Sequence, residues 1–160
     1  MPQKMDLILW RHAEALELRD GSEIGDDLAR PLTPKGERQA QRMATWLNRH
    51  LTAGTRILAS PARRTQQTAQ ALDRRFKTVP ALAPDGTVEG LLAVARWPGS
   101  REPVLVVGHQ PTLGMTAGYL LTGDAQPWPL RKGALIWLRA RERDGKTQVV
   151  LHGAMAPDLL

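Results

Sequence analysis

The sequence predicts a three-layer α/β/α sandwich built around a mostly parallel sheet. Short, almost wholly apolar runs alternate with segments of helical periodicity, and no long linker or internal repeat interrupts them. Such runs are typical of strands that helices cover on both faces. A chain of 160 residues, 42% hydrophobic and 24% charged, has the size and balance of one globular domain. We therefore expect residues 1–160 to fold as a single unit.

The first third of the chain predicts a central strand, a loop and an amphipathic helix. Met5–Trp10 is short and apolar, as a buried parallel strand would be. Residues 21–30 are polar and contain glycine, which indicates a loop. Thr33 and Pro34 supply an N-cap and a first helical residue. The apolar stripe of the helix that follows consists of Ala40, Met43, Ala44, Leu47 and Leu51.

The remaining elements continue the alternation and end in a hairpin. Thr55–Ala59 predicts the second strand, and Ser60 with Pro61 repeats the signal of a cap followed by proline, for a helix that runs to about Phe76. The Asp144-Gly145 pair between two apolar runs is a hairpin signal. The other predicted elements are a short strand at Lys77–Pro80, a helix at Val88–Trp97, a strand at Val104–Gly108, a helix at Pro111–Leu121 and the hairpin strands Ala134–Arg139 and Gln148–His152.

Composition narrows the classes of function. The net charge of +6 allows a phosphate-rich partner, but the arginines are scattered. There is one Phe and one Tyr, and the five Trp mostly lie in apolar contexts that packing explains, so a base-stacking platform is poorly supported. We therefore do not expect nucleic-acid binding, and interpret the charge as a basic solvated surface that could also dock an acidic protein. The absence of cysteine excludes disulfides and a thiolate nucleophile. No apolar run is long enough for a membrane span, so we expect a soluble, cytoplasmic protein.

Side chains that bind phosphate follow three of the predicted strands. Arg11 and His12 come after the first strand, Arg64 lies just past the second, and His109 follows the third. The carboxyl ends of parallel strands meet at one edge of a sheet, so these groups should converge on one anion pocket. The glycine-containing segments lack the Gly-Lys-Ser/Thr ending of a nucleotide-binding loop, and no His-Glu-x-x-His zinc motif occurs.

Four blocks of the sequence, in order, resemble the histidine phosphatase superfamily, which has the phosphoglycerate mutase-like fold. The blocks are Arg11–Ala15 (Arg-His-Ala-Glu-Ala), Arg30–Gly36, Ser60–Ala69 and Val107–Pro111. Larger members of that superfamily insert a lid between the second arginine and the second histidine. The connection here is short, which is similar to the SixA-type phosphohistidine phosphatases without a lid.

The resemblance implies a role for each matching residue. His12 would attack phosphorus and form a phosphohistidine intermediate that water hydrolyses. Arg11 and Arg64 would clamp the phosphoryl oxygens, and His109 would stabilise the charge that develops on them. Arg63 is a rival for the role of Arg64, but Arg64 holds the motif position. The resemblance implies no metal and no other cofactor.

Two positions depart from the simplest family pattern. Ala13 replaces the usual glycine, so one methyl group must be accommodated beside the nucleophile. The general acid is not decided by the sequence, because Glu14, Asp85 and Glu89 are all candidates. Glu14 lies nearest to the nucleophile along the chain. An imidazole leaving group can be protonated by solvent and needs less help than an alkoxide, which favours a phosphoramidate substrate.

These observations predict a metal-independent phosphatase that acts on phosphohistidine in a protein such as a histidine-phosphotransfer domain. An open site without a lid would accept a side chain presented by another fold. One alternative is a phosphatase of small phosphoesters. A second alternative is a phosphate-binding module without catalysis, which the set of two arginines and two histidines disfavours.

Overall fold

One six-stranded sheet contains every strand of the computed structural model, which describes residues 5–18 and 24–160. Its spatial order is β3-β2-β4-β1-β5-β6. The first four strands in sequence run parallel, β5 is antiparallel to β1, and β6 is antiparallel to β5. The expected mostly parallel sheet is thus confirmed. The strands are β1 (Met5–Arg11), β2 (Arg56–Ala59), β3 (Lys77–Thr78), β4 (Val104–Gly108), β5 (Leu135–Arg143) and β6 (Lys146–Met155).

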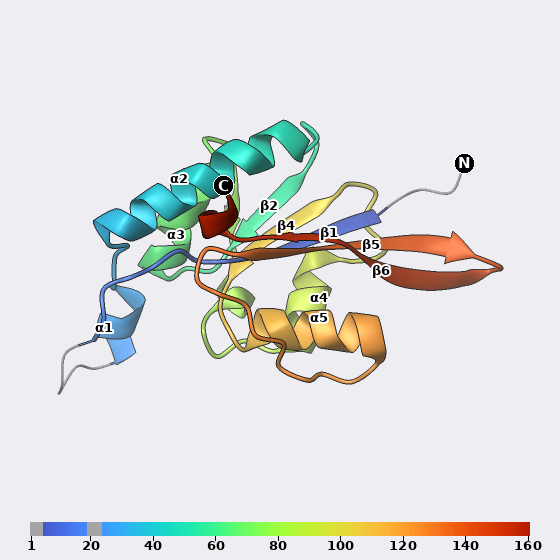
Figure 1. The fold of residues 1–160 in the computed structure, drawn as a ribbon. Helices are drawn as coiled ribbons and strands as arrows, with labels where there is room; N and C mark the ends of the chain where they lie inside the picture. The colour runs from blue at the N-terminus through green and yellow to red at the C-terminus, as the bar shows by residue number, and fades with distance from the viewer. Residues whose placement is uncertain (1–4, 19–23) are drawn as a thin grey trace.

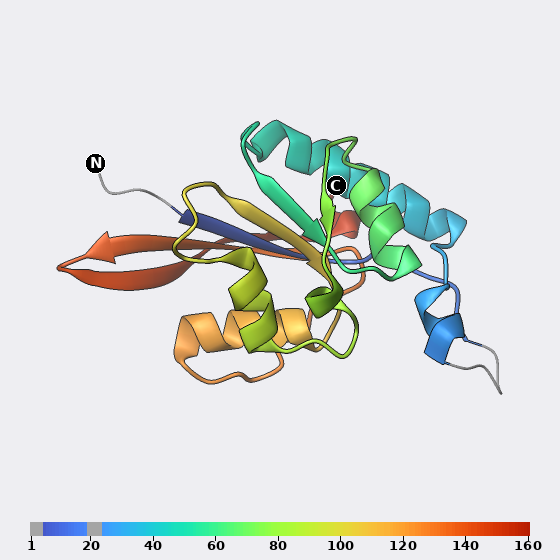
Figure 2. The same cartoon turned by 180° about the vertical axis from the view of Figure 1, so that it is seen from behind.

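Helices cover both faces of the sheet, as a three-layer sandwich requires. Figures 1 and 2 show α2 and α3 on one face and α4 and α5 on the other, while α1 lies beyond the end of the sheet. The connection from α3 to β4 contains only β3, a 3₁₀ turn and α4, so it holds no lid insertion. The helices are α1 (Ile24–Leu28), α2 (Pro34–His50), α3 (Arg63–Gln70), α4 (Val88–Ala95) and α5 (Thr112–Thr122), with 3₁₀ turns at Pro80–Leu82 and Pro157–Leu159.

The apolar strands supply two separate cores, one on each side of the sheet. Leu7 and Leu9 of β1 belong to the cluster that packs on α4 and α5. Ile8 and Trp10 belong to the cluster that packs on α2 and α3. All four side chains are fully buried. Alternate side chains of a strand point to opposite faces, so the middle of a strand between two cores is apolar on both faces.

The loop predicted at residues 21–30 is partly wrong. Residues 21–23 lie outside the described part of the chain, but Ile24–Leu28 forms the short helix α1. Asp27 of this helix accepts a hydrogen bond from the Arg30 side chain at 3.1 Å, three residues on. Asp26 and Asp27 also lie in its first turn, where negative charge is favourable.

The helix after β2 begins later and ends earlier than the sequence signals predict. Ser60 is not its N-cap, because α3 starts at Arg63 with Ala62 in the cap position. The Ser60 hydroxyl instead accepts from the Ala62 backbone amide at 3.2 Å, before the helix has begun. The helix ends at Gln70 rather than near Phe76, and Asp73 follows with a positive φ of 53°. Such a φ cannot continue a right-handed helix.

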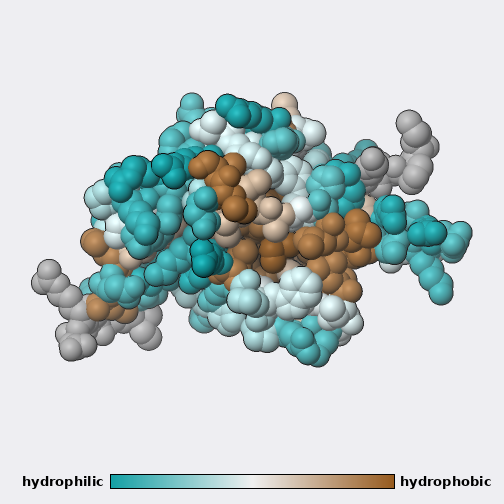
Figure 3. Space-filling model, viewed as in Figure 1, coloured by the Kyte–Doolittle hydropathy of each residue, from teal (hydrophilic) through white to brown (hydrophobic). Residues whose placement is uncertain are grey.

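On the face shown in Figure 3, apolar residues gather in a band along the sheet. Figure 3 shows the apolar band on the side where β6 lies, and Leu151 of that strand is 52% exposed. Among the residues that the structure describes, none of the helices has the length and hydropathy to cross a bilayer.

Candidate active site

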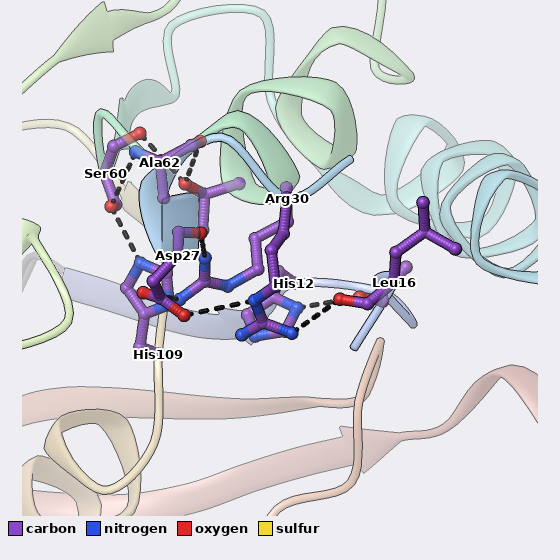
Figure 4. A network of polar contacts seen from close by, with 10 residues as sticks. His12, Leu16, Asp27, Arg30, Ser60, Ala62 and His109 are labelled. Carbon is purple, nitrogen blue, oxygen red and sulfur yellow. Dashed lines mark hydrogen bonds and ion pairs between the residues drawn. The ribbon is translucent and has the colours of Figure 1, made fainter. Parts of the chain in front are cut away.

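Three neighbouring strands deliver the predicted residues to one edge of the sheet. The order β2-β4-β1 places the ends of these strands side by side. The backbone amide of His12 donates to Gly108 O at 3.1 Å, and that of Ser60 donates to Val107 O at 3.1 Å. The end of β4 therefore fixes the segments that follow both of its neighbours. The ring centroids of His12 and His109 lie 5.3 Å apart (Figure 4).

The residues of this pocket are polar but withdrawn from solvent. His12, Arg64 and His109 are 5%, 3% and 4% exposed, and Arg11 is half-buried. Arg63, the rival of Arg64, is exposed on the outside of α3. Buried histidines and arginines are uncommon unless they are paired or serve a ligand. The structure thus brings Arg11, His12, Arg64 and His109 together.

His12 has the protonation state that a nucleophile needs. Its Nδ1 lies 2.7 Å from the carbonyl oxygen of Ala13. A carbonyl only accepts, so Nδ1 carries the proton and the lone pair of the neutral ring is on Nε2. Burial lowers the pKa of His12 to about 3, against the opposing effect of the Ala13 bond and with help from the charges of Arg64 and Arg11. The ring is neutral at physiological pH.

His109 is also a neutral ring, and its hydrogen-bond partner is Ser60. Its Nε2 lies 2.8 Å from Oγ of Ser60, the residue that follows β2. Burial lowers the pKa of His109 to about 3, and the positive charge of Arg64 acts in the same direction. The permanent charge of the pocket therefore belongs to the two arginines, not to the histidines.

Three buried donors or acceptors of the pocket have no partner within the described residues. They are Nε of Arg11, Nε of Arg64 and Nδ1 of His109. Buried polar atoms of folded proteins are nearly always hydrogen-bonded, and an unpaired one costs about 1–3 kcal/mol. The three groups lie on β1, on α3 and just after β4, at one edge of the sheet. They indicate a binding site for an oxyanion, whose oxygens would accept hydrogen bonds from them.

Asp27 is a residue of this pocket that sequence reasoning missed. Arg64 donates to the Asp27 backbone oxygen at 2.8 Å and to its carboxylate at 3.3 Å. Partial burial acts to raise the pKa of Asp27, but the charges of Arg64 and Arg30 outweigh it and lower the pKa below its ordinary value. The spacing of Asp27 and Arg30 could have suggested their ion pair. Nothing in the sequence indicated the contact with Arg64, 37 residues away.

The three candidates for the general acid lie at different places. Oε2 of Glu14 accepts from the Thr33 hydroxyl at 2.7 Å, at the N-terminus of α2. Asp85 and Glu89 line a cavity of about 520 Å³ together with Pro111, beside the start of α5. Within the described residues, no hydrogen bond or ion pair joins any of the three carboxylates to His12.

Ala13 fits where the family pattern has glycine. Its side chain is fully buried in a small cluster with Leu32 and Ala40. Its backbone amide donates to Thr68 Oγ1 of α3 at 3.1 Å, which ties the segment after His12 to the helix that carries Arg64. The extra methyl group is therefore part of the packing. No three His, Asp or Glu residues of the described chain gather as a metal site would require.

The fold and the pocket together define an α/β protein with an oxyanion site built around a neutral histidine. The chain belongs to the histidine phosphatase superfamily: residues 7–92 match the profile of branch 1 of that superfamily. It is 30% identical over 132 residues to the phosphohistidine phosphatase SixA of Escherichia coli, covering 77% of this chain and 78% of that protein.

Solved structures agree with this assignment. A structure from Nakamurella multipartitia, described as a candidate SixA phosphohistidine phosphatase, matches with a TM-score of 0.75 and 32% identity over 96% of both chains. The protein histidine phosphatase SixA in complex with tungstate matches with a TM-score of 0.74 and 27% identity, over 97% of this chain and 99% of that one. The phosphoglycerate mutase-like fold inferred from the four sequence blocks is confirmed.

Proposed function

We propose that this protein is a metal-independent phosphatase that forms a phosphohistidine intermediate on His12. The observation that carries the proposal is the state of His12: a buried neutral ring whose Nδ1 is committed to Ala13, 2.7 Å away, which leaves Nε2 as the nucleophilic atom. The three unpartnered groups on Arg11, Arg64 and His109 support it, because they can donate hydrogen bonds to the phosphoryl oxygens.

In the first step, Nε2 of His12 attacks phosphorus and the bond from phosphorus to the leaving group breaks. Arg11 and Arg64 hold the charge on the phosphoryl oxygens throughout, and as permanent cations they need no proton transfer to do so. In the second step, water attacks phosphorus, the N–P bond breaks and inorganic phosphate leaves. His12 returns to its neutral form, and the protons released go to the leaving group and to solvent.

The proposed substrate is a phosphohistidine side chain on a protein, such as a histidine-phosphotransfer domain. The Escherichia coli relative described as a phosphohistidine phosphatase supports this class, as does the solved structure described as a protein histidine phosphatase. The lack of a lid between α3 and β4 supports a macromolecular substrate, because a lid would close over the site. Asp27 is ionised, because its pKa is lowered, so this pocket carboxylate has no proton to give to a leaving group. An imidazole leaving group needs such an acid less than an alkoxide does.

The test measures phosphate release from a phosphohistidine-bearing protein, with EDTA present and p-nitrophenyl phosphate as a parallel substrate. Wild type should release phosphate from the protein faster than from the ester. His12→Ala should lower turnover by roughly 10³-fold or more while tungstate still binds, because the arginines remain. His50→Ala is the matched control, since His50 is exposed at the end of α2 and should be replaceable without loss.

The possible results separate the alternatives. Release from p-nitrophenyl phosphate only would favour a phosphatase of small phosphoesters. An active His12→Ala variant would refute the nucleophile. Loss of activity with EDTA would refute the metal-independent mechanism.

A further inference from the structure

Ser60 contacts the second histidine of the pocket and is completely buried. It follows β2, and its hydroxyl oxygen lies 2.8 Å from Nε2 of His109. The loop around it is fixed at several points: Thr65 and Gln66 donate side-chain hydrogen bonds to the Ser60 carbonyl at 3.0 and 2.7 Å, and its amide donates to Val107 O. The hydroxyl group therefore has little freedom of position.

The hydrogen bonds of this hydroxyl decide which nitrogen of His109 bears the proton. Oγ of Ser60 accepts the Ala62 amide at 3.2 Å. Its own proton has a single acceptor within the described residues, which is Nε2 of His109. If Nε2 were protonated, the hydroxyl proton would point into a fully buried site with nothing to accept it, at a cost of about 1–3 kcal/mol.

We propose that Ser60 is a positioning residue that donates to Nε2 of His109 and so keeps the proton of the neutral ring on Nδ1. Nδ1 is the nitrogen of His109 without a partner in the described chain. With the proton there, it is a donor for a phosphoryl oxygen. With the proton on Nε2, Nδ1 would instead present a lone pair to the anion and repel it. This consequence for catalysis rests on the proposed function.

The tautomer itself can be measured without any activity. In ¹⁵N NMR, a protonated ring nitrogen and a bare one have well-separated shifts, and couplings to the ring protons distinguish Nδ1 from Nε2. The chain has four histidines, and loss of one signal set in His109→Gln assigns the ring. Near neutral pH, wild type should show Nδ1 protonated and Nε2 bare. A His109 protonated on Nε2 overturns the proposal, whether or not the protein is a phosphatase.

Two matched variants test what the contact does for turnover. Ser60→Ala removes the donor, and His109 should then show a mixture of tautomers. Turnover should fall about 10- to 100-fold, the effect usual for an outer partner of a functional histidine. Thr65→Val is the control: it removes another fully buried hydroxyl, in the first turn of α3, which donates to the carbonyls of Ser60 and Ala62 and does not touch His109.

The control separates loss of positioning from loss of structure. Thr65→Val should keep the Nδ1-protonated form and lose less than about 3-fold in turnover. An unchanged tautomer in folded Ser60→Ala would overturn the proposal, as would equal losses of turnover in the two variants. If wild type lacks phosphatase activity altogether, the proposed function fails, while the NMR spectrum still decides the role of Ser60.

Discussion

In the proposed mechanism, the two histidines and the two arginines of the pocket have different chemical roles. His12 and His109 are buried, and burial lowers the pKa of each to about 3, so neither carries charge at physiological pH. Arg11 and Arg64 supply the positive charge, because a guanidinium cannot lose its proton in a protein. The neutral ring of His12 can then offer a lone pair, and that of His109 can offer a directed N–H donor. A protonated His12 could not attack phosphorus.

The lowered pKa values of the histidines predict a loss of stability in acid. Their folded-state pKa, about 3, lies below the ordinary value of 6.5, so the unfolded state binds more protons between these values. The stability is complete above about pH 6.5 and falls as the pH is lowered through that window. From about pH 7 to about pH 5, each histidine should cost roughly 2 kcal/mol in free energy of unfolding.

Urea unfolding at the two pH values measures this loss. Replacing His109 with Gln should remove about half of the pH-dependent part, whereas His50→Gln, at an exposed position, should leave it unchanged. If the wild type loses no more stability than His109→Gln over this range, the histidines are not buried in neutral form.

Asp27 competes with an anionic ligand for Arg64, and its removal should strengthen anion binding. Arg64 now gives two hydrogen bonds to Asp27, one to the backbone and one to the carboxylate. Asp27→Asn keeps a side chain of the same shape but removes the negative charge beside the pocket. The inhibition constant of tungstate should therefore fall roughly 3- to 10-fold.

Steady-state inhibition assays with tungstate check the Asp27 prediction. Glu17→Gln is the matched control for net charge, because that carboxylate is 83% exposed and pairs with Lys132 rather than with a pocket residue. Weaker tungstate binding by Asp27→Asn would instead mean that the carboxylate holds Arg64 in its binding position.

Helix α2 supports the nucleophile segment through a glycine in its first turn. A Cβ atom added at Gly36 would lie 2.0 Å from the backbone oxygen of Glu14. The Thr33 cap also binds this segment, since its amide donates to Glu14 O and its hydroxyl to the Glu14 carboxylate. The helix and the residues after His12 therefore pack with their backbones in contact, which only glycine permits at this position.

Replacing Gly36 with Ala should destabilise the protein although alanine favours helices. Helix propensity alone would give about 1 kcal/mol of stabilisation. The backbone contact cannot yield as a flexible side chain could, so we expect a net loss of about 1–3 kcal/mol. Thermal or urea unfolding measures it, with Gly90→Ala in α4 as control, because a Cβ there meets nothing nearer than the Thr87 hydroxyl at 3.1 Å. Stabilisation by Gly36→Ala would contradict this account of the packing.

The elements with strong local patterns could be predicted, and those that depend on distant partners could not. β1 and β4 are short and mostly apolar, and α2 begins at Pro34 after the Thr33 cap as its sequence indicates. Ser60 carried an equally good cap signal, but its hydroxyl binds His109, 49 residues away, instead of capping a helix. Asp27 was missed for the same reason, since its role depends on Arg64. Local patterns do not encode such contacts.

The whole molecule keeps the pocket and the long β5–β6 hairpin at opposite ends of the sheet. Figure 1 shows α1 beyond one end and the tip of the hairpin beyond the other. β1 pairs with β4 and β4 with β2, so the pocket residues lie at or just after the ends of three hydrogen-bonded strands. A site held by regular elements is positioned more precisely than one built on loops.

The net charge of +6 predicts how a protein substrate would approach the pocket. A basic surface should attract an acidic phosphoprotein over long distances, and added salt screens this attraction. The small ester p-nitrophenyl phosphate carries few charges, so its binding depends mainly on the pocket itself. From about 0.05 to about 0.5 M NaCl, kcat/KM for the phosphoprotein should fall roughly 10-fold or more with little change in kcat, and kcat/KM for the ester should fall much less.

Arg63→Ala, which removes an exposed charge next to Arg64, should reduce the salt dependence for the phosphoprotein alone. Equal salt dependence for the two substrates would show that salt acts within the pocket and that the basic surface plays no part in docking.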